Sequence, residues 1–106
     1  MGYNIVLVTC PQADSSKIAS LLVEKKLAAC VNILNVHSVY RWEGKIAKEE
    51  ESLLIIKTKE ELFPDMEREI KLIHPYKVPE IISFKIEKGY IDYLNWIEEN
   101  TASGKG

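Results

Sequence analysis

The segment His74-Pro75-Tyr76-Lys77-Val78-Pro79-Glu80 places an imidazole, a phenol, an ammonium and a carboxylate close together. An imidazole supported by a carboxylate suits Cu(II), and His74 beside Tyr76 or Glu80 is suited to acid–base work. Each proline removes a backbone donor and favours an extended conformation at the residue before it. We therefore expect a stiff connector that carries a site between two packed elements.

The rest of the chain offers little for catalysis. No nucleophile motif, glycine-rich phosphate loop or set of paired carboxylates accompanies the connector. We therefore expect a binding protein and not an enzyme.

The composition is that of one globular domain, which we take to be residues 1–106. Of the 106 residues 46% are apolar and 28% are charged. The net charge of −2 gives no electrostatic reason to expect nucleic acid or an anionic membrane as a partner. No apolar run approaches the ~18 residues of a transmembrane helix. The two cysteines form neither a CxxC pair nor a disulfide framework, which favours a reducing, cytoplasmic location.

Hydrophobic periodicity predicts seven elements and a frayed polar tail over residues 101–106. We expect strands at residues 3–10, 29–42, 46–58 and 81–89, and helices at 14–28, 59–73 and 91–97. Pro64 should lie in the first turn of the second helix, where a missing N–H costs little. Gly44 should form the turn between the two middle strands.

The order β-α-β-β-α-β-α predicts a ferredoxin-like α+β sandwich, with an antiparallel sheet and helices on one face. The two middle strands are each about twice as long as the usual 5–6 residues. Two helices cannot cover such a hairpin, so its distal half, near Tyr40, Trp42 and Gly44, should project. Monomers seldom leave aromatic side chains and strand edges exposed in this way. We therefore expect a homo-oligomer that assembles through the hairpin.

Several sequence motifs resemble the CutA (divalent-cation tolerance) family, in that family's order and spacing. They are Leu27-Ala28-Ala29-Cys30-Val31-Asn32-Ile33, Ser38-Val39-Tyr40-Arg41-Trp42-Glu43-Gly44, Lys57-Thr58, His74-Pro75-Tyr76 with Pro79-Glu80, and Tyr93-Leu94-Asn95-Trp96-Ile97. The resemblance implies a ferredoxin-like homotrimer built through long hairpins and linked to tolerance of copper and other divalent ions. For animal members it also implies a role in anchoring a protein partner.

The resemblance points to His74, Glu80 and a cysteine near the end of the first strand as metal candidates. Cys10 is that cysteine, unless the family position corresponds to Val8. Lys77 stands where the family commonly has a glutamate. Because the chain lacks H-x-H and CxxC spacings, we expect weak binding of Cu(II) or another divalent cation, shared between subunits, and no organic cofactor.

A small ligand is the other possible occupant. We expect Tyr40, Trp42, Lys57, His74, Tyr76 and Glu80 to line a cleft between subunits, where Lys57 and Lys77 suit a small anion held over aromatic walls.

Each candidate residue also has a structural interpretation. His74 can instead serve merely as a stabilising cation at the C-terminus of a helix. Glu80 is either an exposed residue or the partner of a cation such as Lys57. Tyr40 and Trp42 can pack in an oligomer interface. We expect Cys30 to be buried and Cys10 to be the more accessible cysteine.

The sequence thus predicts a non-enzymatic, homotrimeric protein of divalent metal-ion tolerance. The alternatives are a PII-like sensor of a small anion or metabolite, and a hub that anchors an unknown protein partner.

Overall fold

The computed structural model describes residues 2–103. The elements follow the predicted order of types: β1 (Tyr3–Cys10), α1 (Gln12–Glu24), β2 (Cys30–Trp42), β3 (Lys45–Lys59), a 3₁₀ turn (Glu60–Leu62), α2 (Phe63–Ile73), β4 (Ile81–Lys85) and α3 (Ile91–Glu99). Pro64 lies in the first turn of α2, as predicted.

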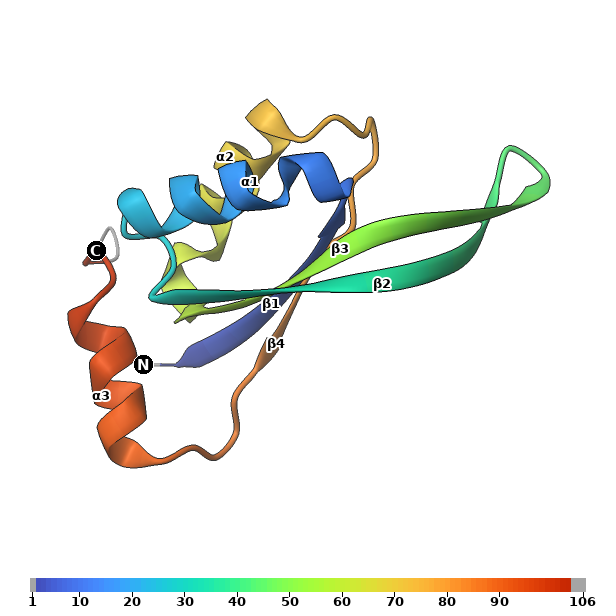
Figure 1. Ribbon diagram of the computed structural model, residues 1–106. Helices are drawn as coiled ribbons and strands as arrows, with labels where there is room; N and C mark the ends of the chain where they lie inside the picture. Colours follow the sequence, from blue (N-terminus) through green and yellow to red (C-terminus); the bar gives the residue numbers. More distant parts are fainter. Residues whose placement is uncertain (1, 104–106) are drawn as a thin grey trace.

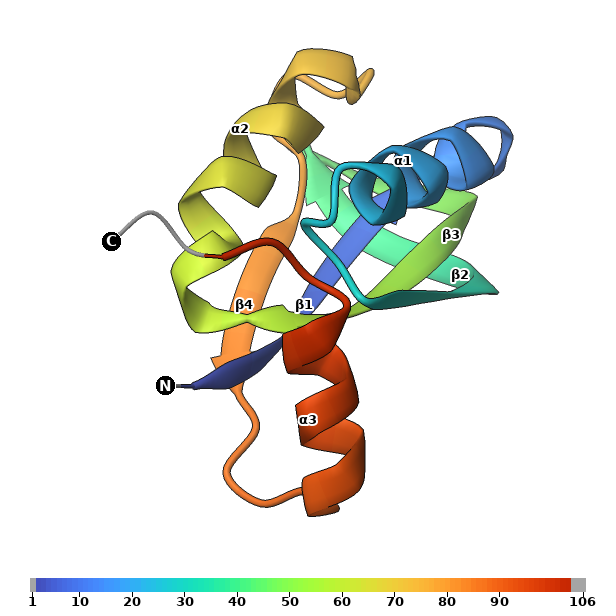
Figure 2. The same ribbon diagram turned by 90° about the vertical axis from the view of Figure 1, so that its left-hand side faces the viewer.

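The four strands form one sheet in the order β2-β3-β1-β4, and every neighbouring pair is antiparallel. Helices α1 and α2 lie side by side over one face of this sheet (Figures 1 and 2). Helix α3 packs against β3 at the end of the molecule opposite the hairpin (Figure 1). The chain therefore has a compact α+β fold with a layer of strands and a layer of helices.

The core lies between the sheet and the helices α1 and α2. Alternation along β1 directs Val6, Val8 and Cys10 into this layer, where all three are fully buried. The expectation that Cys10 is the accessible cysteine is therefore wrong. Cys30 pairs in register with Lys57 and is only partly buried. The strand period, and not the neighbouring proline, decides which cysteine is exposed.

Helix α1 ends four residues before the predicted boundary at residue 28. Lys26 adopts a left-handed conformation with φ of 59°, which a right-handed helix cannot continue through. The backbone N–H groups of Leu27 and Ala28 then bond to the carbonyl oxygen of Leu22, at 2.9 and 3.2 Å. These bonds provide donors for a carbonyl oxygen in the last turn of the helix, and the chain then leads directly into β2.

The C-terminal segment is attached at its start. Thr101 is buried, and its hydroxyl donates to the carbonyl oxygen of Ile97 at 2.8 Å. The N–H of Ala102 donates to the carbonyl oxygen of Lys26, also at 2.8 Å. The predicted fraying of residues 101–106 therefore does not apply to Thr101 and Ala102, and residues 104–106 lie outside the described residues.

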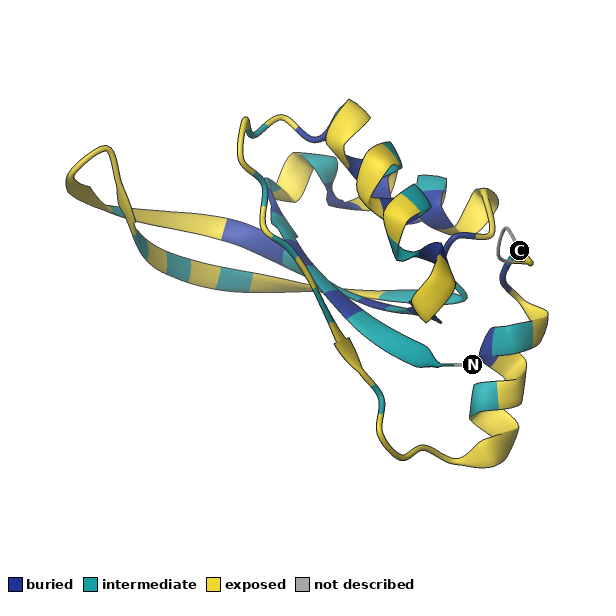
Figure 3. Cartoon of the chain, turned by 180° about the vertical axis from the view of Figure 1, so that it is seen from behind, coloured by how far each residue is buried: buried dark blue, intermediate teal, exposed yellow. Residues whose placement is uncertain are grey.

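The β2–β3 hairpin projects beyond the helices, as expected from its length (Figure 1). Its arms contain 13 and 15 residues, and the molecule extends 44 Å along its longest axis. Glu43 and Gly44 have φ of 50° and 79°, the conformation of a tight hairpin turn with two left-handed residues. The distal half of the hairpin is largely exposed (Figure 3).

The face of the sheet away from α1 and α2 is apolar. Ile82 and Phe84 on β4 pair in register with Leu7 and Ile5 on β1, and each remains 50% exposed. Leu34 on β2 is also exposed. We call these three side chains the open-face patch. Within residues 2–103, no helix combines the length and apolar character needed to cross a bilayer.

Candidate functional site

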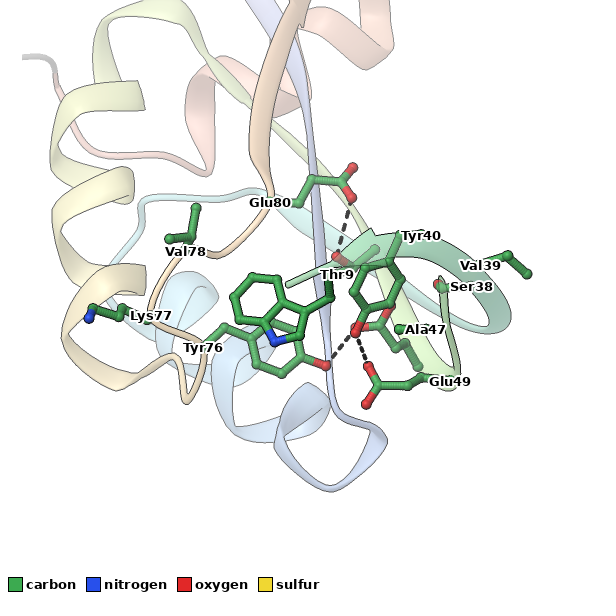
Figure 4. A pocket seen from close by; sticks show the side chains of 12 residues that line it. Thr9, Ser38, Val39, Tyr40, Ala47, Glu49, Tyr76, Lys77, Val78 and Glu80 are labelled. Carbon is green, nitrogen blue, oxygen red and sulfur yellow. Dashed lines mark hydrogen bonds between the residues drawn. The ribbon is translucent and has the colours of Figure 1, made fainter. Parts of the chain in front are cut away.

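A groove of about 680 Å³ lies between the hairpin and the connector that follows α2 (Figure 4). This volume is typical of sites for small ligands. The lining residues come from β1, both arms of the hairpin and the connector: Thr9, Ser38, Val39, Tyr40, Trp42, Ala47, Glu49, Glu51, Tyr76, Lys77, Val78 and Glu80.

The register of the hairpin explains how its residues meet in the groove. Tyr40 pairs with Ala47 and Ser38 pairs with Glu49, so these side chains project from one face of the two arms. The phenol of Tyr40 donates a hydrogen bond to the Glu49 carboxylate (Figure 4). Glu51 lies two residues further along β3, on the same face.

The connector closes the other side of the groove through two hydrogen bonds. The Tyr76 phenol donates to Oε2 of Glu51 at 2.6 Å. Glu80 lies just before β4, and its Oε1 accepts from the Thr9 hydroxyl at 3.2 Å. The connector is therefore tied to β3 by Tyr76 and to β1 by Glu80.

His74 is buried behind the groove, and both of its ring nitrogens are engaged. Nε2 lies 2.8 Å from the carbonyl oxygen of Thr9, and Nδ1 lies 3.1 Å from the backbone nitrogen of Tyr76. Since a carbonyl only accepts and an N–H only donates, Nε2 carries the proton and Nδ1 accepts. The ring is thus the neutral tautomer, which argues against a cation at the C-terminus of α2. In this arrangement His74 positions the connector.

Lys57 lies outside the groove. Its ammonium donates a hydrogen bond to the side-chain oxygen of Asn32. Lys57 pairs in register with Cys30, away from the groove-lining residues. The structure therefore brings together Tyr40, Trp42, Tyr76 and Glu80 from the predicted ligand-binding set. Lys57 and His74 lie elsewhere.

Sequence reasoning missed Glu49 and Glu51. Both belong to the acidic run Glu49-Glu50-Glu51, which reads as the solvated start of a strand. Their spacing of two residues could have identified them, because it places both side chains on the side of the strand that carries Ala47. Glu50 faces the other way, where its Oε2 lies 2.6 Å from Nδ1 of the exposed His37.

The groove is acidic. Three carboxylates line it, from Glu49, Glu51 and Glu80, and Lys77 is the one cationic residue among the lining residues. The hydrogen bond to Glu49 raises the pKa of Tyr40 to about 12, with burial and the charges of Glu49 and Glu51 adding to the effect. Burial, then the hydrogen bond to Glu51, raises the pKa of Tyr76 as well. The phenols therefore remain protonated donors.

The side chains that we predicted to bind metal differ in how far they are exposed to solvent. Burial, with the charges of Asp14 and Glu51, raises the pKa of the Cys10 thiol to about 11, which disfavours the thiolate that metals bind. Glu80 is the exposed member of the set. Within residues 2–103, no cluster of three or more His, Cys, Asp or Glu side chains is arranged to hold a metal ion.

The fold is that of a small α+β protein with an extended hairpin and a groove beside it. The family described as CutA1 divalent ion tolerance protein matches residues 4–100. A Thermus thermophilus relative, named divalent-cation tolerance protein CutA, is 44% identical over 100 residues, which cover 92% of this chain and 97% of that protein. The chain therefore belongs to the CutA1 divalent ion tolerance family.

Solved structures and longer relatives agree with this assignment. The Thermus thermophilus structure matches with a TM-score of 0.91 at 43% identity, covering 94% of this chain and 99% of that one. The rice CutA1 structure matches at 0.95 and 40% identity, covering 98% and 97%. Mouse Protein CutA is 43% identical over 102 residues, which make up 94% of this chain but only 58% of the mouse protein. A rice relative is named Protein CutA 1, chloroplastic.

Proposed function

We propose that this chain is a non-enzymatic, homotrimeric protein of divalent metal-ion tolerance that binds cations weakly in the groove between hairpin and connector. The observation that supports the site most directly is the groove's lining of three carboxylates beside aromatic side chains. The family assignment supports the link to metal tolerance.

The proposed assembly follows from surfaces that a monomer leaves uncovered. Strand β2 is an edge strand of 13 residues, and the open-face patch adds three exposed apolar side chains. Long free edges and contiguous apolar surface are usually covered in a stable protein. The strand order β2-β3-β1-β4, with α1 and α2 on one face, supports a ferredoxin-like subunit, and the trimer itself is proposed from the family resemblance and the long hairpin.

For the metal we propose Cu(II) or another divalent cation bound mainly by carboxylate oxygen, with Glu80 as the accessible donor. His74 would join only by exchanging the hydrogen bond that its Nδ1 accepts from the Tyr76 N–H. Cys10 would join only through a thiolate that its burial disfavours. Such a site holds metal weakly, because carboxylates alone lack the imidazole nitrogen that Cu(II) prefers.

Calorimetric titration of the sized oligomer with copper(II) chloride tests this function. We expect saturable binding that Glu80→Gln weakens by about tenfold, or about 1.4 kcal/mol. Glu67→Gln is the matched control, because it removes the same charge from an exposed position on α2, outside the groove. Absence of binding, or equal binding by both variants, would remove the metal from the groove.

The acidic lining argues against the small-anion sensor. An anion in this groove would face three carboxylates and one ammonium, and like charges at close range are unfavourable. A cytoplasmic location and a protein partner remain predictions.

A further inference from the structure

We propose that the groove binds small aliphatic diamines in their doubly protonated form. This inference rests on the proposed function, because it assigns an organic ligand class to the same cation-binding groove. It is carried by the charge of the groove, by its aromatic walls and by the separation of its carboxylates.

The groove carboxylates are hydrogen-bonded but not neutralised. Each accepts from an uncharged hydroxyl, which belongs to Tyr40, Tyr76 or Thr9. Among residues 2–103, the ion pairs involve other acidic residues and none includes Glu49, Glu51 or Glu80. Each carboxylate keeps acceptor capacity, since two oxygens offer about four lone-pair positions. A cationic ligand would supply the missing charge.

The walls of the groove suit an ammonium group attached to a hydrocarbon chain. Tyr40, Trp42 and Tyr76 all line it, and Trp42 is 51% exposed in the single chain. Aromatic faces attract cations and also cover methylene groups. An inorganic ion would use the carboxylates but leave these apolar walls in water, whereas an alkylammonium uses both.

The two outermost carboxylates of the groove, those of Glu80 and Glu49, are separated, which favours a ligand with two charges. Figure 4 shows Glu80 at one end of the group of side chains and Glu49 at the other, with the Tyr40 phenol between them. Glu51 lies between these two ends, because along β3 it stands between Glu49 and Leu53, and Leu53 pairs in register with the Thr9 that bonds to Glu80. A diamine can place one ammonium at each end and its methylenes along the aromatic rings. A monoamine leaves one end unpaired.

Lys77 does not neutralise this charge. Its side chain leads away from the phenol rings and from both ends of the groove (Figure 4). It is exposed, and within residues 2–103 it takes part in no ion pair. Its remaining effect is a positive potential near the connector, which opposes the binding of a cation.

The test is calorimetric titration of the sized oligomer with 1,4-diaminobutane at low ionic strength. Three ligands of similar length serve as comparisons: butylamine with one charge, 1,4-butanediol with none and succinate with two negative charges. We expect saturable diamine binding, roughly tenfold weaker butylamine binding, and none of the diol or succinate. Fluorescence of Trp42 in a Trp96→Phe chain locates the event, because Trp96 lies on α3 outside the groove.

Four variants make the test specific. Glu80→Gln and Glu49→Gln should each weaken diamine binding by roughly tenfold. Glu67→Gln should leave the affinity unchanged, and Lys77→Gln should raise it. Binding of succinate in preference to the diamine would overturn the inference. So would a diamine affinity that is the same in Glu80→Gln and Glu49→Gln as in the unsubstituted chain.

The same titrations separate this inference from the proposed function. Copper binding that depends on Glu80, without diamine binding, overturns the diamine assignment and leaves the metal function standing. Diamine binding that depends on Glu80 and Glu49, without copper binding, supports the assignment and overturns the metal function. Displacement of bound copper by the diamine supports both when the pH keeps both amines protonated, because a protonated amine cannot ligate copper in solution.

Discussion

The phenol of Tyr76 donates a 2.6 Å hydrogen bond to a carboxylate oxygen of Glu51, a residue that is only 4% exposed. This bond joins the connector to the middle of β3 and forms one wall of the groove. The phenol supplies a hydrogen bond to an acidic side chain at a buried position, where a carboxylate without a partner would be costly. The pair therefore links the stability of the connector to the acidity of the site.

Replacing Tyr76 with Phe should destabilise the fold. The substitution removes the donor and leaves a buried carboxylate without it, which typically costs about 1–3 kcal/mol. The free energy of unfolding in urea, at fixed protomer concentration, measures the loss. Tyr90→Phe is the matched control, since the Tyr90 phenol also donates to a carboxylate, that of Asp92, but at an exposed position. Equal losses in the two variants would contradict the role given to Tyr76.

The Tyr40 phenol should lose its proton only at unusually high pH, and the stability of the fold should fall as it does so. Its pKa is raised from 10.0 to about 12, chiefly by the hydrogen bond to Glu49. A raised pKa in the folded state contributes stability below the unfolded value, and this is lost as pH rises through the folded value. The contribution is therefore complete below pH 10 and declines toward pH 12. Ultraviolet titration of phenolate should show one late-titrating group fewer in Tyr40→Phe, and an unchanged curve would contradict the assignment.

The C-terminal helix should depend on a buried lysine. Lys59 is 2% exposed, and its Nζ lies 3.1 Å from Oε2 of Glu98, whose other oxygen accepts from Tyr3 at 3.1 Å. Glu98→Gln should lower the unfolding midpoint, because it leaves the Lys59 cation buried without its counter-charge. Adding Lys59→Met should restore much of the loss, since an apolar side chain of similar size needs no partner.

The same pair predicts an acid dependence. The hydrogen bond from Lys59 holds the pKa of Glu98 below its usual 4.5, so its contribution is present above that pH and is lost as pH falls below it. Chemical denaturation at several pH values checks this.

If the variant that combines Glu98→Gln with Lys59→Met is no more stable than Glu98→Gln alone, the pairing of Lys59 with Glu98 is contradicted.

The open-face patch should hold the oligomer together. Phe84→Glu places a charge among apolar side chains that the proposed trimer buries, so we expect dissociation to a folded monomer. Light scattering gives the mass, and circular dichroism checks that the strands and helices persist. Leu72→Glu on α2 is the control, because Leu72 is exposed on the helical side. Dissociation by both variants, or by neither, would remove the patch from the interface.

Local patterns in the sequence determine the order of elements and the projecting hairpin. Alternation identifies the strands, and the long arms around Gly44 already exceed what two helices can cover. The connector was also recognisable, because Pro75 and Pro79 interrupt the surrounding periodicity.

Contacts between distant segments could not be predicted in the same way. The tautomer of His74 depends on the Thr9 carbonyl, which is 65 residues away. The separation of Lys57 from the groove depends on its register with Cys30. The acidic character of the site came from Glu49 and Glu51, whose roles appear only when Tyr40 and Tyr76 are placed beside them.

The central claim is that the groove selects cations through its carboxylates. Calorimetric titration of Lys77→Gln with copper(II) chloride, beside the unsubstituted chain, tests this claim most directly, because the substitution removes the one ammonium among the lining residues. We expect tighter copper binding by the variant at low ionic strength. Weaker binding would contradict this role of the carboxylates, because it would make the Lys77 ammonium part of the site instead of a charge that opposes the cation.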